Sequence, residues 1–120
     1  MNELSSDSDI LIIKPYWANL ILNGEKTMEI RSCSCKNKVN KRIYISKSGT
    51  QQIFGSVFLK SCIGPLSSDE FHAHKDLHRV ETTMYKKNYG WIFSDVTVFD
   101  NPIPYKHKKG AIIWLKYQSL

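Results

Sequence analysis

Short apolar runs separated by polar segments recur along the chain and predict a series of short strands. The first run, residues 9–14 (DILIIK), is rich in β-branched residues and predicts a strand of roughly four residues. Similar runs predict strands at 26–31, 42–46, 53–62, 89–99 and 110–117. The Asn-Pro-Ile-Pro run at 101–104 is expected to end the strand before it, because proline cannot donate to a strand ladder.

A helix is predicted immediately after the first strand, over residues 15–23. Pro15 is favoured in the first turn of a helix, because its missing N–H would be unpaired there. Trp17, Leu20 and Ile21 follow an i, i+3, i+4 spacing and therefore form one apolar face. Gly24 then marks the end of the helix, because glycine adopts the left-handed conformation at C′ without strain.

A second helical region is predicted later in the chain. Ser67 and Glu70 have the S-x-x-E spacing of a capping box, so a helix is expected from 69 to about 79 and a second helical piece over about 81–87. The order is thus a strand, a helix, and then several strands with one helical insertion. This order predicts an α+β fold, a small mixed β-barrel, in preference to a doubly wound parallel sheet.

Residues 24–31, GEKTMEIR, combine strand alternation with a high density of charge. The apolar side chains at 28 and 30 are expected on one face of the strand, and those of Glu29 and Arg31 on the other. Lys26 falls at the beginning of the strand, where the turn can direct it toward the same charged face. These charges are either a structural ion pair with a solvated lysine or a group gathered around a ligand.

The length of 120 residues is enough for one domain with one core. Residues 1–9 are polar and acidic without periodicity, so we expect a disordered leader followed by a folded domain over 10–120. The sequence shows neither a secretory signal nor the ~18 apolar residues of a membrane span. We therefore expect a soluble, intracellular (cytoplasmic) protein, and the odd number of cysteines, three, predicts free thiols.

The net charge of +6 is concentrated in two basic clusters. The first cluster comprises Lys36, Lys38, Lys41 and Arg42, and the second comprises Lys106, His107, Lys108 and Lys109. They are either two solvated loops or a surface that faces a polyanion, because clustered lysine and arginine attract phosphates and release counterions. Charge alone does not distinguish RNA from DNA.

Three histidines, at 72, 74 and 78, fall in the predicted helical region. His74 and His78 are four residues apart, a spacing that two zinc ligands can use, but the H-E-x-x-H pattern is missing. We therefore expect an exposed polar helix face with one packed histidine, no metal site and no cofactor.

The run IIKPYWANLILNGEKTMEIR, residues 12–31, resembles the beginning of ASCH domains, which belong to the PUA-like superfamily. The family's G-x-K-x-x-E-x-R signature is filled here by Gly24, Lys26, Glu29 and Arg31. Later segments are similar to family strands and loops in the same order: RIYIS, IFGSVFL, YGWIFSDV and NPIPYKHKKGAIIWL. The resemblance covers roughly residues 10–118.

The resemblance implies a PUA-like β-barrel with a cleft lined by Lys26, Glu29 and Arg31. It also implies RNA binding, so we expect this cleft to bind RNA or a nucleotide-like ligand. Because the sequence has no long apolar span, we expect no membrane partner. Arginine offers a planar fork to a phosphate or a base edge, and aromatic side chains can stack on bases. The candidate stacking side chains, each of which could instead pack in the core, are Tyr16, Trp17 and Trp91. The candidate nucleic-acid surface comprises Lys36, Lys38, Lys41, Arg42, Lys106, Lys108 and Lys109.

Two other functions stay open at this stage. Some family members are similar to hydrolases that act on modified nucleosides or on RNA, so Lys26 and Glu29 are the candidate catalytic residues of an amidohydrolase or ribonuclease. One amidohydrolase branch, which cleaves N4-acetylcytidine, shares the signature lysine but has threonine at the position of Glu29, and its distant glutamate would have to be Glu70. The third alternative is a protein-interaction module in which Glu29 and Arg31 form only a structural ion pair.

Overall fold

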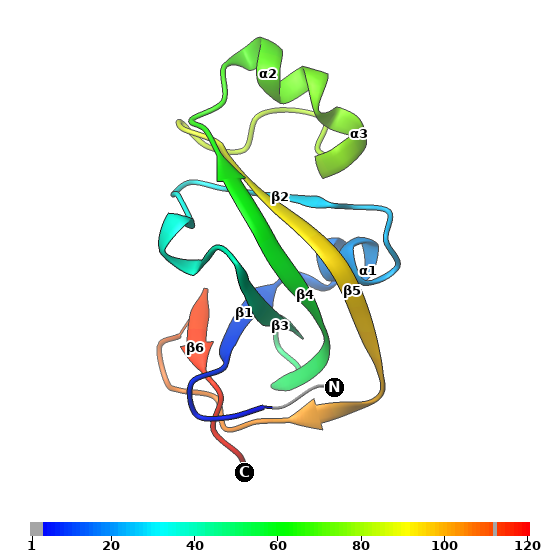
Figure 1. Cartoon of the computed structure of the whole chain (residues 1–120), viewed down its shortest axis with the longest axis vertical. Coiled ribbons are helices and arrows are strands. Elements are labelled where there is room, and N and C mark those ends of the chain that lie inside the picture. The colour runs from blue at the N-terminus through cyan, green and yellow to red at the C-terminus, as the bar shows by residue number, and fades with distance from the viewer. Residues whose placement is uncertain (1–3, 112) are drawn as a thin grey trace.

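A computed structural model describes residues 4–111 and 113–120 (Figure 1). Its elements are β1 (Asp9–Ile13), α1 (Pro15–Leu22), β2 (Met28–Arg31), the 3₁₀ turn η1 (Lys36–Lys38), β3 (Lys41–Lys47), β4 (Gln52–Ile63), α2 (Ser68–Ala73), α3 (Lys75–His78), β5 (Tyr89–Pro104) and β6 (Trp114–Lys116). The six strands form one curled sheet in the order β2-β5-β4-β3-β1-β6. β1 is parallel to β3 and the other pairs are antiparallel. This mixed half-barrel confirms the predicted α+β class.

The long β4–β5 pair runs through the whole molecule (Figure 1). α2 and α3 lie at one end of this pair, and β1, β6 and the C-terminus lie toward the other. Between these ends, α1 buries Ala18 and Ile21 in a core shared with β1, β3, β4 and β5. None of the helices in the described part of the chain is long and apolar enough to cross a membrane.

The turn after α1 sets the position of the charged strand. Gly24 has a φ of 85°, the left-handed conformation expected of the residue that ends this helix. Two residues later, the N–H of Lys26 donates to the carbonyl of Leu20 at 3.0 Å. The chain therefore folds back along the helix before β2 begins, which brings Lys26 beside α1.

The expected break at 101–104 is wrong, because β5 continues to Pro104. The N–H of Tyr105 donates to the carbonyl of Gln51 at 3.2 Å, so in an alternating strand the nitrogens of Pro102 and Pro104 face away from β4. β2 pairs with β5 only as far as Ile92, and beyond it this side of β5 pairs with no strand of the described chain. Two prolines whose nitrogens face an unpaired edge cost no ladder hydrogen bond.

The helical insertion differs from its prediction in two ways. The helix expected over 69–79 is two short helices, α2 and α3, with His74 between them. The second helical piece expected over 81–87 is wrong, because this segment is an irregular loop. The side chain of Asn88 accepts from the N–H groups of Met84 and Tyr85 at 3.2 and 3.1 Å and donates to the Tyr85 carbonyl at 2.9 Å. Asn88 thus binds the backbone groups that a helix would have paired.

The two ends of the chain compare with expectation in different ways. Of the predicted leader, residues 1–3 lie outside the described residues, and Asp9, which was also predicted to begin the first strand, is part of β1 and is only 4% exposed. The closing strand expected over 110–117 is shorter, since β6 contains only three residues, and residue 112 lies outside the described part. The strand predictions for β1, β3 and β4 agree with the structure to within one residue at each end.

Candidate functional site

The two faces of β2 have different surroundings. Met28 and Ile30 pack with Phe71 and Val80 beneath the helical insertion. Glu29 and Arg31, which pair in register with Trp91 and Tyr89 of β5, point to the opposite face. The alternation read from the sequence is therefore present, with one face in a hydrophobic cluster and the other in a charged cleft.

The cleft has a volume of about 200 Å³ and is bounded by five parts of the chain. These are β1 with the residue after it, α1, β2 with the turn before it, the turn after β3 and the loop before β5. The lining residues are Ile12, Lys14, Trp17, Lys26, Glu29, Ile30, Arg31, Ser48, Met84 and Tyr85. The structure therefore brings together all three charged signature residues and one of the three predicted aromatic residues.

Glu29 lies between the two cations of the signature. Its Oε2 accepts a hydrogen bond from Nε of Arg31 at 2.9 Å, and its Oε1 lies 3.5 Å from Nζ of Lys26. The Glu29 side chain is 6% exposed, and the burial of its carboxylate is compensated by the two positive charges. Glu29 and Arg31 therefore form a direct, hydrogen-bonded ion pair.

Arg31 is held in place but keeps donors available. Besides Glu29, it donates through Nη2 to the carbonyl of Ile12 in β1 at 3.1 Å. A guanidinium has five N–H donors, so three have no partner among the residues that the structure describes. The side chain is 14% exposed and borders the cleft. It can therefore donate to a ligand without rearranging.

Lys26 forms the floor of the cleft and is only 1% exposed. Its ammonium donates to the carbonyl of His78 and lies 4.6 Å from the centre of the Trp17 ring. Burial lowers the pKa of Lys26 to about 8, opposed by the attraction of Glu29 and assisted by the repulsion of Arg31. A fraction of this lysine is therefore neutral near physiological pH, which is unusual for an amine.

His78 is the packed histidine of the insertion. It is fully buried, its Nε2 lies 2.7 Å from the carbonyl of Phe71, and its Nδ1 accepts from the N–H of Val80 at 2.9 Å. These two partners assign the proton to Nε2 and leave the ring neutral. Burial also lowers the pKa of His78, which favours the same neutral form. In the described chain, no group of three or more metal-ligating side chains is found.

The three predicted aromatic residues have different surroundings. Trp17 lines the cleft. Tyr16 is 66% exposed and makes an edge contact with Trp17 without lining the cleft. Trp91 is fully buried, stacks on Trp114 at 5.6 Å and donates to the carbonyl of Cys33, so it is a core residue and offers no ring face to a ligand.

Among the lining residues that were not identified from the sequence are Met84 and Tyr85. They belong to the loop that was expected to be helical, and their position depends on the Asn88 side chain. Glu70, the candidate distant carboxylate, forms the capping box with Ser67 instead: its carboxylate accepts from the Ser67 N–H at 2.8 Å. It does not line the cleft.

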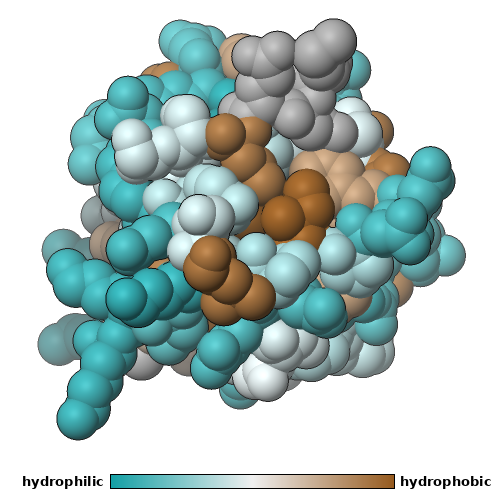
Figure 2. Space-filling model, turned by 90° about the horizontal axis from the view of Figure 1, so that it is seen from below, coloured by the Kyte–Doolittle hydropathy of each residue, from teal (hydrophilic) through white to brown (hydrophobic). Residues whose placement is uncertain are grey.

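In the structure, the residues of the two basic clusters are grouped differently from their order in the sequence. Lys38 lines a second, larger depression of about 930 Å³, here called the lysine groove, together with Lys106, Lys108, Lys109 and Lys116. Lys41 and Arg42 lie outside its lining, and Arg42 donates to Ser56 at 3.0 Å and to the Asp95 carbonyl at 2.9 Å. Lys36 is exposed in η1. The end of the molecule that carries the C-terminus is largely hydrophilic, with apolar residues in the middle of the face (Figure 2).

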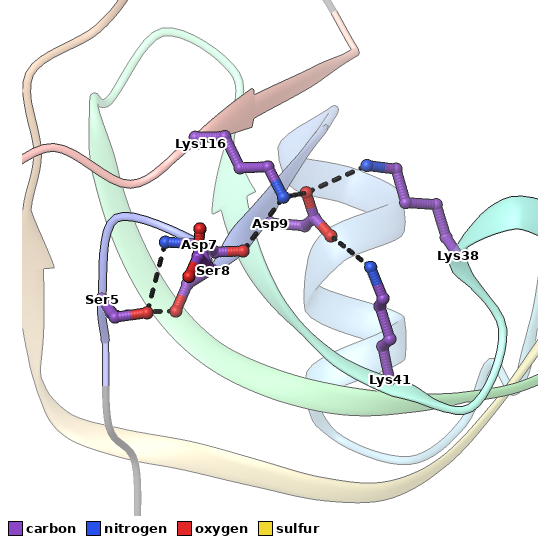
Figure 3. Close-up of polar contacts among 7 residues, drawn as sticks. All are labelled: Ser5, Asp7, Ser8, Asp9, Lys38, Lys41 and Lys116. Atoms are coloured by element: carbon purple, nitrogen blue, oxygen red, sulfur yellow. Dashed lines mark hydrogen bonds and ion pairs between the residues drawn. The ribbon is translucent and has the colours of Figure 1, made fainter.

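The buried carboxylate of Asp9 forms ion pairs with two lysines of the lysine groove, Lys38 and Lys116. Asp9 lies 2.8 Å from Nζ of Lys116, 3.0 Å from that of Lys38 and 3.9 Å from that of Lys41 (Figure 3). Burial alone would raise the pKa of Asp9, but the bonds from Lys116 and Lys38 outweigh it and lower the pKa below its usual value. Neither Asp9 nor Lys116 was identified from the sequence, because Asp9 lay at the end of the expected leader and Lys116 lies within the closing strand, apart from the two basic clusters.

The curled mixed sheet, the helix after the first strand and the charged cleft define a PUA-like ASCH-type domain. The family model of the ASCH domain matches residues 11–103, and the chain belongs to this family. ASCH domains are generally associated with nucleic-acid binding. No curated protein matches the chain.

Solved structures with the same fold include three of an ASCH protein from Zymomonas mobilis. The unmutated protein has 16% identity and a TM-score of 0.70, with 83% of this chain and 75% of that chain covered. A tyrosine-to-phenylalanine mutant has 17% identity and a TM-score of 0.60, covering 82% and 76%. A serine-to-alanine mutant has 14% identity and a TM-score of 0.66, covering 97% and 92%. At this identity the similarity establishes the fold alone.

Proposed function

We propose that the protein binds single-stranded RNA, or a nucleotide-like ligand, in the cleft lined by Lys26, Glu29 and Arg31. The observation that carries the proposal is the state of Arg31. Its guanidinium is held by Glu29 and by the Ile12 carbonyl, yet three N–H donors have no partner in the described chain and the side chain borders the cleft. A pre-positioned planar donor of this kind suits a phosphate or a base edge.

The size and the walls of the cleft favour one nucleotide unit at a time. Its volume of about 200 Å³ is below the ~300–1,000 Å³ of sites for drug-sized ligands. Trp17 and Tyr85 both line it, and aromatic rings are the usual stacking surfaces for unpaired bases. Double-stranded RNA does not present its bases in this way, which favours a single strand.

Replacement of the arginine by lysine tests this proposal. Arg31→Lys keeps the positive charge beside Glu29 but removes the planar fork, so we expect a several-fold or greater loss of affinity for a fluorescein-labelled oligouridine in anisotropy titrations. The matched control is Arg79→Lys, since Arg79 is an exposed arginine bonded to the Asp76 carbonyl and does not line the cleft. If Arg31→Lys lowers thermal stability but leaves RNA affinity at the control value, the ion pair is only structural and the proposal fails.

A hydrolase is the second candidate, and the lowered pKa of Lys26 favours it. With a pKa of about 8, this buried lysine holds its amine partly neutral beside Glu29, as a general base or nucleophile requires. We expect such an enzyme to show a rate that increases with pH up to about 8 and is abolished in Lys26→Met. Release of cytidine from N4-acetylcytidine, or cleavage of a short RNA, measures it. Product formation that persists in Lys26→Met would exclude this role.

A further inference from the structure

Three depressions of the surface share lining residues and therefore adjoin one another. The cleft adjoins a hollow of about 250 Å³ through Ile12 and Ser48, which line both. This hollow adjoins the lysine groove of about 930 Å³ through His107, which lines both of them. A path therefore leads from Arg31 in the cleft, over the hollow, to the lysine groove.

The lysine groove carries positive charge that the protein does not neutralise. Asp9 is its single lining carboxylate in the described chain, and it pairs with Lys38 and Lys116. The other three lysines of the groove make no ion pair with a described residue; they are Lys106, Lys108 and Lys109. A groove in which cations from separate elements outnumber the carboxylate suits a chain of phosphates better than one small anion.

The hollow between the two sites has hydrogen-bonding groups suited to a polar chain. Ser48, Gly49 and Gln51 are exposed and line it. At its junction with the lysine groove, Nδ1 of His107 is buried and has no hydrogen-bond partner among the described residues. A buried polar atom without a partner is uncommon in a folded protein, and a bound sugar or phosphate could satisfy it.

A series of ring contacts limits the separation of the two sites. The Arg31 guanidinium lies 5.8 Å from the centre of Trp91, Trp91 stacks on Trp114 at 5.6 Å, and Lys38 Nζ lies 5.2 Å from the centre of Trp114. These distances limit the straight line from Arg31 to Lys38 to less than about 17 Å, which a stacked strand covers with about five nucleotides at ~3.4 Å each. Because Trp91 is buried, the path over the surface is longer than this line.

We propose that one RNA strand occupies both sites: a nucleotide lies in the cleft, the strand crosses the hollow, and its following phosphates lie in the lysine groove. This inference rests on the proposed function of the cleft and adds a second contact region. A strand of about five nucleotides or more is long enough for the greatest straight-line separation, so we expect it to engage both sites and to gain avidity from their linkage, whereas we expect a dinucleotide in the cleft to contact the cleft alone.

The test is an anisotropy titration of labelled oligouridines of two and twelve nucleotides at several salt concentrations. The groove variant is the double replacement Lys108→Ala with Lys109→Ala. Each lost phosphate contact lowers the log–log salt slope by ~0.7 for a single strand, so we expect a decrease of about 1.4 for the twelve-nucleotide RNA. When the salt is lowered from 1 M to 0.1 M, the affinity of the variant should therefore increase about 25-fold less than that of the wild type. The dinucleotide should bind the variant as it binds the wild type.

The matched control removes two lysines outside all three depressions, Lys60→Ala with Lys75→Ala, and so lowers the net charge equally. Equal behaviour of the groove and control variants with the long RNA would overturn the inference, and so would equal slopes for the two RNA lengths with wild-type protein. These outcomes leave dinucleotide binding in the cleft intact. If the wild-type protein binds neither RNA, the proposed function itself fails, which is a different result.

Discussion

Lys26→Met should change how the stability of the protein depends on pH. Lys26 is 1% exposed, and burial lowers its pKa from 10.5 to about 8. Between these two values, the folded protein has released the proton and the unfolded chain still holds it. The unfolded state thus binds more protons, so the free energy of unfolding increases with pH across this window. From these two pKa values, the increase between pH 7 and pH 10 is about 2 to 3 kcal/mol.

Methionine keeps the length of the side chain, leaves the Glu29–Arg31 bond untouched and removes this titration. The stability difference, wild type minus Lys26→Met, should therefore rise by about 2 to 3 kcal/mol from pH 7 to pH 10. Urea unfolding followed by far-ultraviolet circular dichroism measures this difference, because groups that titrate alike in both proteins cancel. Lys60→Met, at an exposed lysine of β4, is the control and should give a flat difference. A flat difference for Lys26→Met as well would refute the burial argument and the general-base role together.

Two further substitutions test the supports of the two sites. Asp9→Asn should cost a few kcal/mol of stability, because it leaves the ammonium groups around Asp9 without their buried carboxylate. In thermal unfolding, this loss of stability should be smaller at 0.5 M than at 0.05 M salt. A loss that does not depend on salt would mean that charge repulsion is not its cause. Asn88→Ala should lower the free energy of unfolding by about 1 to 3 kcal/mol. It should also speed hydrogen exchange at the amides of Met84 and Tyr85, which lose their acceptor. Unchanged exchange at these amides would contradict the role of Asn88 in shaping the cleft.

The parts of the site that lie close together in sequence could be predicted, and those that depend on distant segments could not. The period of two in residues 24–31 was enough to place Glu29 and Arg31 on one face. The burial of Lys26 depends on α3, whose His78 carbonyl covers it from 52 residues away. The contact between Asp9 and Lys116 joins β1 and β6, the first and last strands along the chain. No local pattern encodes such pairings.

The loop that carries Tyr85 shows a second reason why part of the structure could not be predicted from the sequence. Its sequence was expected to be helical from local signals alone, but the buried Asn88 side chain binds three backbone groups of Met84 and Tyr85. The same kind of competition explains β5, where the direction of the proline nitrogens, and not the presence of proline, decides whether the strand continues.

A crystal structure of the protein with a bound uridine dinucleotide tests the central proposal most directly. We expect a nucleotide in the cleft, with a phosphate or base edge bonded to Arg31 and a base against Trp17 or Tyr85, while the Glu29–Arg31 bond persists. A dinucleotide bound at another surface, with the cleft unoccupied at saturating concentration, would contradict it.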